Sequence, residues 1–292
     1  MATQNVQGKI NPKKIKNMKK FNPTYYLLAI GGAAILLVLI LILSIHIAGF
    51  RYAKYEVGDT TVKFLGKVDS EGNYVSGDLY YLDGQTAEYS YDVASKKATV
   101  KYSNGDIYVG KTDKFLRHGE GRMEYSNGNI YVGNFEYDKI NGSGTFYYVS
   151  GDKYTGEFLD GLKHGKGLYV WPSSSEGAFD SYEGEYYKDL RNGQGTYKWS
   201  DGTIYTGEYV NDQKHGKGIM TFPNGDVYTG DFANDFRTGK GTYNFINGDV
   251  YVGDFTENKM TGYGKYTWAD VTVKPYEGYF ENGVIVVVDE NK

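Results

Sequence analysis

The sequence contains no cysteine, which excludes disulfide bonds and thiolate metal sites in any compartment. It has only four histidines and no pattern typical of catalysis: no Ser/His/Asp set, no P-loop, no His-x-x-x-His pair and no dinucleotide-binding glycines. The tetrapeptide Gly-Lys-Gly-Leu at 165–168 falls inside an expected strand, whereas a phosphate-binding loop joins a strand to a helix. The sequence therefore predicts a protein that is not an enzyme, with no cofactor and no metal site.

An excess of positive charge is absent beyond the N-terminus. The net charge is −4, but residues 1–25 hold six lysines and no acid, so the remainder carries −10. Because neutralisation of phosphates by Lys and Arg dominates nucleic-acid binding, an acidic body argues against nucleic acid as the main partner.

Long apolar runs are also absent, except for one from Tyr26 to Phe50 that only a serine and a histidine interrupt. Because about 20 apolar residues span the hydrocarbon core as a helix, we expect a single transmembrane helix over 25–50. A basic cytoplasmic tail over 1–24 precedes it. A cleavable signal peptide is the alternative, but its apolar region is shorter, about 7–15 residues. The lysine bias predicts a cytoplasmic N-terminus and an extracytoplasmic remainder.

Glycine and tyrosine, in contrast, are abundant, with 40 and 31 residues. Much of this excess belongs to a repeat typified by Tyr154 to Trp171, which reads YTGEFLDGLKHGKGLYVW. Its step is 23 residues at five of seven intervals. The opening aromatic recurs at Tyr108, Tyr131, Tyr154, Tyr182, Tyr205, Tyr228, Tyr251 and, in a truncated unit, Tyr276.

Each repeat is expected to form a β-hairpin, because its apolar residues alternate with period two. Tyr154 should face Tyr169 across the hairpin, with a six-residue turn between the strands. Asn-Gly and Asp-Gly pairs between units, such as Asn127-Gly128 and Asp201-Gly202, predict tight turns there. The expected fold is all-β: an elongated, twisted, single-layer antiparallel meander of 23-residue hairpins, preceded by the one transmembrane α-helix.

The chain divides into parts by how well it keeps the repeat. Residues 51–107 are interpreted as degenerate N-terminal capping repeats, because terminal repeats of an array are commonly atypical. The regular array covers 108–283. Residues 284–292 are expected to be a C-terminal capping strand and tail, which would cover the open edge of the sheet.

The motif Tyr-x-Gly-x-aromatic, a polar turn and Gly-x-Gly-x-aromatic resembles the MORN repeat. The resemblance covers about 108–283, in seven consecutive units with all three glycines, although the first unit has Thr112 where an aromatic is usual. It implies an elongated twisted antiparallel sheet. It also implies a role in protein–protein contact or membrane-proximal scaffolding, with phospholipid binding proposed for the family.

The repeated aromatic positions are the candidate binding residues. Stacked along a sheet, they would form ladders that stabilise it. A single-layer sheet has no second layer to cover both faces, so the alternative is an exposed aromatic binding surface. The candidate residues are Tyr154, Tyr169, Trp171, Tyr182, Tyr197, Trp199, Tyr205 and Trp268.

The repeated charges are interpreted as structural. The register that pairs Tyr154 with Tyr169 makes Glu157 face Lys166, and it makes the equivalent acids and bases face each other in other units. The expected pairs are Glu157–Lys166, Glu208–Lys217, Asp231–Lys240 and, with reversed signs, Lys111–Glu120. At the turn edge basic and acidic positions interleave, so we expect that edge to pair with itself and not with lipid phosphates.

These patterns predict a non-catalytic scaffold, anchored in a membrane through its N-terminal helix, that presents an elongated sheet to a protein partner. The alternative is a surface module whose aromatic rows bind an envelope glycan or a phospholipid.

Overall fold

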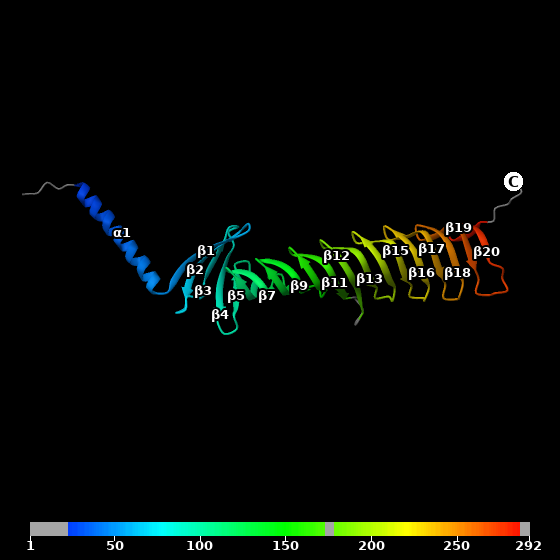
Figure 1. The fold of residues 1–292 in the computed structure, drawn as a ribbon, viewed down its shortest axis with the longest axis horizontal. Coiled ribbons are helices and arrows are strands. Elements are labelled where there is room, and N and C mark those ends of the chain that lie inside the picture. Colours follow the sequence, from blue (N-terminus) through cyan, green and yellow to red (C-terminus); the bar gives the residue numbers. More distant parts are fainter. Residues whose placement is uncertain (1–22, 173–177, 287–292) are drawn as a thin grey trace, which may run out of the picture. The chain divides into compact units, whose positions relative to one another are not determined.

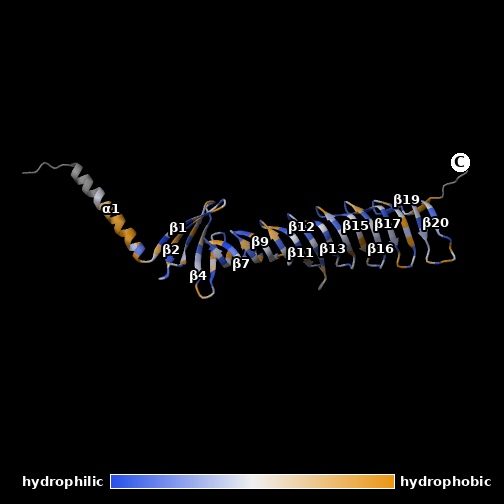
Figure 2. Ribbon diagram, viewed as in Figure 1, coloured by the Kyte–Doolittle hydropathy of each residue, from blue (hydrophilic) through white to orange (hydrophobic). Residues whose placement is uncertain are grey.

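The computed structural model describes residues 23–172 and 178–286. The chain forms two compact units, Met1–Arg51 and Tyr52–Lys292. In the first unit, helix α1 runs from Pro23 to Ile47, and its described part is predominantly hydrophobic (Figure 2). Its large apolar side chains from Ile35 onward are exposed. Within the described ranges, no helix is both long enough and apolar enough to cross a membrane. The expected basic tail, 1–24, lies outside the described residues except for its last two.

The second unit is an open antiparallel sheet in which each strand pairs with its neighbours along the chain (Figure 1). This arrangement confirms the predicted all-β, single-layer meander. The described residues form 21 strands: β1 Phe50–Val57, β2 Thr60–Val68, β3 Tyr74–Tyr81, β4 Thr86–Asp92, β5 Lys97–Tyr102, β6 Ile107–Asp113, β7 Leu116–Glu124, β8 Ile130–Glu136, β9 Lys139–Tyr147, β10 Lys153–Leu159, β11 Leu162–Pro172, β12 Phe179–Tyr187, β13 Leu190–Lys198, β14 Ile204–Val210, β15 Gln213–Thr221, β16 Val227–Ala233, β17 Phe236–Asn244, β18 Val250–Thr256, β19 Lys259–Thr267, β20 Tyr276–Glu281 and β21 Val284–Val286.

Each repeat is one hairpin, and its register begins as predicted, with Tyr154 opposite Tyr169 and Gly156 opposite Gly167. The prediction of a six-residue turn, however, is wrong. The register shifts after Gly156, so that Glu157 lies opposite His164, and the strands join through a two-residue turn at Asp160 and Gly161. Both turn residues have positive φ, 52° and 86°, as a hairpin turn that matches the twist of its strands requires.

The loops between repeats differ from the tight turns that the Asn-Gly and Asp-Gly pairs predicted. Five residues separate β7 from β8, and only Gly128 among them has positive φ, 91°. The N–H of Tyr125 donates to the carbonyl of Asn129, and the N–H of Gly128 donates to the carbonyl of Tyr125 (both 2.9 Å). The glycine of each pair therefore closes a longer loop, and the two-residue turns lie at the other end of the hairpin.

The opening tyrosine of each repeat locks its hairpin. Tyr205 is fully buried, and its ring lies against the facing glycines, Gly207 and Gly218. Its hydroxyl donates to the carbonyl of Glu208 (3.0 Å). The ring meets Tyr209 of its own hairpin and Phe232 of the next edge to face, at 5.3 and 4.9 Å between centroids. This packing repeats along the array and forms its core.

The glycine pairs of successive hairpins also face one another, so a row of glycines crosses the sheet from β6 to β20. Gly167, for example, lies opposite Gly156 on β10 and Gly184 on β12. The row consists of Gly110, Gly121, Gly133, Gly144, Gly156, Gly167, Gly184, Gly195, Gly207, Gly218, Gly230, Gly241, Gly253, Gly264 and Gly278.

The two ends of the sheet depart from the repeat. Near the N-terminal end, Phe115 stacks on Phe64 (4.6 Å, 5° between planes) and meets Tyr74 and Tyr89 edge to face, which fills the core there. At the C-terminal end, β21 pairs with β20. The remainder of the expected C-terminal segment, 287–292, lies outside the described residues.

Candidate functional site

The structure divides the eight predicted aromatic residues into two groups. The opening tyrosines, Tyr154, Tyr182 and Tyr205, have no exposed surface. A ligand on the sheet therefore has no access to these three rings, because the glycine pair and the neighbouring rings enclose them. The other five are buried or half-buried: Tyr169, Trp171, Tyr197, Trp199 and Trp268.

Four of these five residues form one continuous stack across two hairpins. The ring centroids are 4.2 Å apart for Tyr169 and Trp171, 5.5 Å for Trp171 and Tyr197, and 4.3 Å for Tyr197 and Trp199. Trp268 belongs to another stack, with Tyr266 at 5.0 Å. The arrangement is that of the cross-strand ladder, in which most ring surface is used within the sheet.

Basic side chains cover these rings at the hairpin-turn edge. The Arg191 guanidinium lies 5.5 Å from the Tyr197 ring centre and 5.2 Å from that of Tyr209. Its Nε donates to Asp212 Oδ1 (3.0 Å), and its Nη2 donates to the Asp212 carbonyl (2.8 Å) in the next turn. Arg117 with Asp138 and Lys214 with Asp235 repeat the ion pair. The predicted self-pairing of this edge is confirmed for these residues.

Aspartates connect the loops at the opposite ends of the hairpins. Asp226 Oδ1 accepts the N–H of Ile246 and its Oδ2 accepts the hydroxyl of Tyr243, both at 2.8 Å. Asp249 repeats this arrangement one unit later, with Ala269 and Tyr266, both at 2.7 Å. Both edges of the array therefore use their charges to join one repeat to the next.

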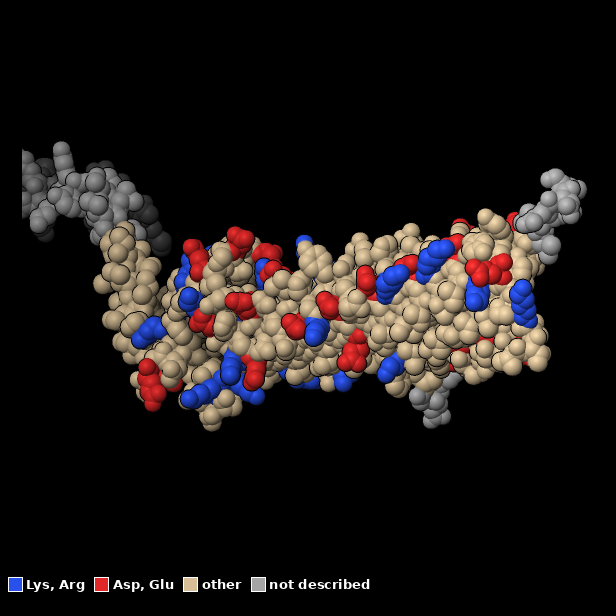
Figure 3. Space-filling model, turned by 45° about the vertical axis from the view of Figure 1, so that its right-hand side comes forward, with Lys and Arg blue, Asp and Glu red and all other residues tan. Residues whose placement is uncertain are grey.

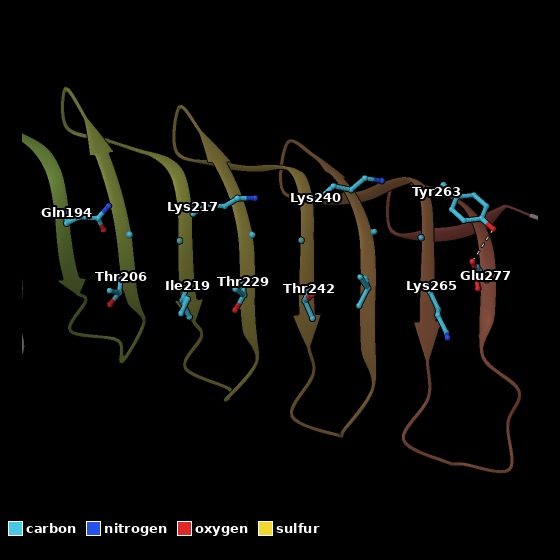
Figure 4. A pocket seen from close by; sticks show the side chains of 17 residues that line it. Gln194, Thr206, Lys217, Ile219, Thr229, Lys240, Thr242, Tyr263, Lys265 and Glu277 are labelled. Atoms are coloured by element: carbon cyan, nitrogen blue, oxygen red, sulfur yellow. Dashed lines mark hydrogen bonds between the residues drawn. The ribbon is translucent and has the colours of Figure 1, made fainter.

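The face that points away from the buried tyrosines carries a groove along the glycine row. A cavity of about 740 Å³ lies over β13 to β20, with the main chain of the glycine row as its floor (Figure 4). One wall is mainly uncharged, and it contains Thr206, Ile219, Thr229, Thr242 and Val252. The other wall is mainly polar, and it contains Gln194, Lys217, Lys240 and Tyr263.

The groove continues toward the N-terminal end of the array. A second cavity of about 890 Å³ extends from β5 to β11, and a third of about 530 Å³ lies between the other two. The third cavity shares Thr155 and Lys166 with the second, and Gln194 and Thr206 with the first. The three cavities therefore form one groove, across which Tyr263 reaches Glu277 at the C-terminal end (3.4 Å).

The sequence interpretation missed these wall residues. They occupy the variable positions of Tyr-x-Gly and of Gly-x-Gly-x-aromatic, and strand alternation places them on the face opposite the tyrosines. Thr206 and Thr229, for example, are both exposed. The signal was present as a row of Thr, Val and Ile beside invariant glycines, but a pattern search that follows the recurring aromatics passes over it.

The charged wall corrects the predicted ion pairs. The register shift after Gly207 is a β-bulge, and it moves Glu208 away from the Lys217 side chain. Glu208 Oε1 instead accepts the main-chain N–H of Lys217 (3.4 Å). The Lys217 ammonium pairs with Asp231 of the next hairpin (2.5 Å), and Lys240 pairs with Asp254 in the same way (2.6 Å). The hydrogen bond from Lys217 is the main reason that the pKa of Asp231 is lowered. These lysines join hairpins to one another, as the charges at the edges do.

The face in Figure 3 shows acidic and basic side chains interspersed, with no extended region of one sign. The histidines of the array lie in strands of separate hairpins, among them His118 in β7 and His164 in β11. His118 packs on Tyr137 (4.6 Å) and His164 packs on Tyr187 (5.3 Å), in separate hairpins. Among the described residues, no group of three potential metal ligands occurs.

Solved structures offer only distant likenesses. The TCP10 domain of Danio rerio CPAP, in complex with a peptide of STIL, matches 79% of this chain and 100% of its own at 12% identity and a TM-score of 0.39. The TCP10c domain of Drosophila melanogaster Sas-4 matches 66% and 99% at 13% identity and 0.27. Virginiamycin B lyase from Staphylococcus aureus matches 80% and 90% at 11% identity and 0.17. These scores are too low to support an argument about this chain.

The sequence of the repeats is more informative. No curated protein matches the chain. The family model of the MORN repeat matches seven consecutive stretches, residues 116–130, 131–153, 154–176, 182–204, 205–227, 228–250 and 251–270. These matches fall on successive hairpins of the sheet, with the opening tyrosine at the start of six of them. The chain belongs to the MORN repeat family.

Proposed function

We propose that this protein is a non-catalytic scaffold that binds a segment of a protein partner along the groove over the glycine row. The continuity of the groove is the observation that carries the proposal. It crosses β5 to β20, which at about 4.8 Å per strand is a length of about 72 Å. Such a length suits an elongated ligand better than a compact one.

The walls also suit a polypeptide. The uncharged wall exposes apolar surface, with Ile219 at 48% and Val252 at 51% of their full exposure. Hydroxyl groups of Thr206 and Thr229 stand beside them. Apolar surface with a few polar groups is typical of binding sites, because the first supplies affinity and the second orientation. The self-paired charges of the edges leave this face as the surface for a partner.

The test uses site-specific photo-cross-linking in the full-length protein in its own cells. Benzoylphenylalanine is placed singly at the groove positions Thr206, Thr229 and Val252, and at two exposed loop positions, Val149 and Ile246. We expect one discrete heterologous cross-link from the groove positions and none from the loop positions. Cross-links of equal yield from both sets, or from the loops alone, would contradict binding in the groove.

Attachment to a membrane is the second part of the proposal, and it rests on the sequence. The apolar run from Tyr26 to Phe50 follows six lysines, and the described apolar side chains of α1 are exposed. The array would then lie outside the cytoplasm. Protease added to intact cells should digest the array, whereas complete protection at a membrane that protease can reach would reverse the orientation.

Binding of a glycan or a phospholipid is a second candidate function, which the half-buried indoles favour. Trp171, Trp199 and Trp268 keep part of their surface exposed. Aromatic rings at this exposure can stack on sugars or insert into a lipid interface. Replacement of the three indoles by phenylalanine should then abolish binding to a glycan array or to anionic vesicles. Binding that survives this change would remove the candidate.

A further inference from the structure

Between β11 and β18, lysines and acids face each other along the groove except at one hairpin. In the hairpin β12–β13, Gln194 occupies the position that Lys217 and Lys240 hold in the next two hairpins. Gln194 lies opposite Glu208 of β14, and its N–H donates to Glu185 Oε1 (3.2 Å). An amide cannot neutralise a carboxylate, so Glu208 has no ammonium group where its counterparts, Asp231 and Asp254, have one.

A further carboxylate stands in the uncharged wall at the same place. Glu183 lies between Leu168 of β11 and Thr196 of β13, at a position where the other full hairpins have Thr or Val and the terminal one has Glu277, opposite Lys265. In the described part of the chain, Glu183, Glu185 and Glu208 form no ion pair. Glu183 and Glu185 line the middle section of the groove, in which Lys166 is the single cation. This section therefore has a net negative charge and is complementary to a basic side chain.

The spacing of the hairpins selects the conformation of the segment. Two strands advance about 9.6 Å along the groove. A polyproline II helix rises about 3.1 Å per residue with three residues per turn, or about 9.3 Å per turn. Each hairpin would then meet an equivalent residue of such a segment. Two turns of an α-helix advance about 10.8 Å, so an α-helix loses register by more than an ångström per hairpin.

From this geometry we infer that the groove takes a polyproline II segment of the partner, with a basic residue seated between Glu183, Glu185 and Glu208. The inference rests on the proposed function, because it specifies the segment that the groove holds. The basic side chain supplies the cation that Gln194 lacks, and the rest of the segment lies over the glycine floor against the threonine wall.

The test is fluorescence anisotropy with labelled peptides and the full-length protein in a non-ionic detergent. The first probe is an 18-residue oligoproline with one central arginine, about 56 Å long. The comparison peptide has glutamate in place of the arginine. We expect the arginine peptide to bind at least tenfold more tightly, with an affinity that falls as salt increases. Equal affinities for the two peptides would overturn the charge assignment.

Two matched variants test the position. Gln194→Lys restores the alternation, and it should remove the preference for arginine. Lys217→Gln repeats the break one hairpin later, and it should improve binding of an oligoproline that carries two arginines three residues apart. A peptide with its arginines two residues apart should gain nothing, because its second arginine does not reach the next hairpin. An equal gain from both spacings would refute the polyproline II register.

Two further outcomes separate this inference from the proposed function. An alanine-based helical peptide with two arginines two turns apart should bind more weakly than the oligoproline, and stronger binding would overturn the conformation alone. If no peptide binds while the groove positions still cross-link to a partner, the inference fails and the proposed function stands. If the cross-links are also missing, both fail.

Discussion

The packing of the opening tyrosine over the glycine pair predicts a large cost for a very small substitution, Gly218→Ala. A Cβ at this position would lie 2.5 Å from Cε2 of Tyr205 and 2.7 Å from its hydroxyl oxygen. Because ordinary contacts are about 3.5–4.0 Å, the ring must move by about 1 Å. The φ of Gly218 is not in the left-handed region, so the backbone itself accepts alanine.

The magnitude follows from what the ring loses. Its edge-to-face contacts with Tyr209 and Phe232 each contribute about 0.5–1.5 kcal/mol, and its hydrogen bond to the Glu208 carbonyl contributes about 1 kcal/mol. Alanine in place of glycine in a strand returns about 0.5–1 kcal/mol of conformational entropy. The net expectation is a loss of about 1–3.5 kcal/mol in local stability.

The assay is hydrogen exchange of peptides from β14 and β15 in the full-length protein, because a repeat array need not unfold in one step. A loss of about 1–3.5 kcal/mol corresponds to exchange about 5–400 times faster. In a Tyr205→Ala background the clash with the ring is absent, so Gly218→Ala should then cost much less. An equal loss in both backgrounds would refute the locking role of the ring.

Two other perturbations test the links between repeats and the burial of the rings. Asp212→Ala removes the acceptor of the Arg191 main-chain N–H and Nε, and it should cost about 1–2 kcal/mol by hydrogen exchange, whereas Glu124→Ala in the exposed Arg122–Glu124 pair should cost under about 0.5 kcal/mol. Burial raises the pKa of Tyr182, Tyr228 and Tyr251 to about 12, above the unfolded value of about 10. The native state therefore holds protons that the unfolded state releases, and stability should be complete below pH 10 and fall as pH rises from about 10 through 12. Absorbance at about 295 nm and circular dichroism should change together in this window; ionisation of these rings with the sheet intact would contradict their burial.

The strands and their register could be predicted from the sequence, because they follow from the period-two alternation of apolar and polar residues. Tyr154 faces Tyr169 as predicted, since period-two patterning with a glycine pair at the centre permits one register. The turn and the bulge do not follow in the same way. The two-residue turns include Lys188-Asp189 and Asn211-Asp212, which lack the glycine that usually marks positive φ at such a turn. Their conformation depends on the hairpins around them.

The ion pairs and the groove could not be predicted from the regular repeat pattern. A regular antiparallel register predicts that Glu208 faces Lys217. The register shift after Gly207 instead leaves the Lys217 ammonium nearer to Asp231 of the next hairpin. The candidate site lies on the face opposite the predicted aromatic residues, and the reason is again local packing. Conspicuous aromatic residues such as Tyr205 are buried by the glycines beside them, while the less conspicuous Thr206 stands on the open face. Which face of a single sheet stays open depends on packing within the repeat, and composition alone does not report it.

The most direct test of the central claim is a steric block of the groove. Thr206→Trp and Thr242→Trp together fill the uncharged wall on either side of Thr229, which carries the photo-cross-linker. The control protein has Val149→Trp and Ile246→Trp, two exposed loop positions away from the groove. Groove binding predicts that the partner cross-link at position 229 disappears in the first protein and persists in the control, with the sheet intact by circular dichroism in both. A cross-link of full yield in the blocked protein would contradict the assignment of the groove as the binding site.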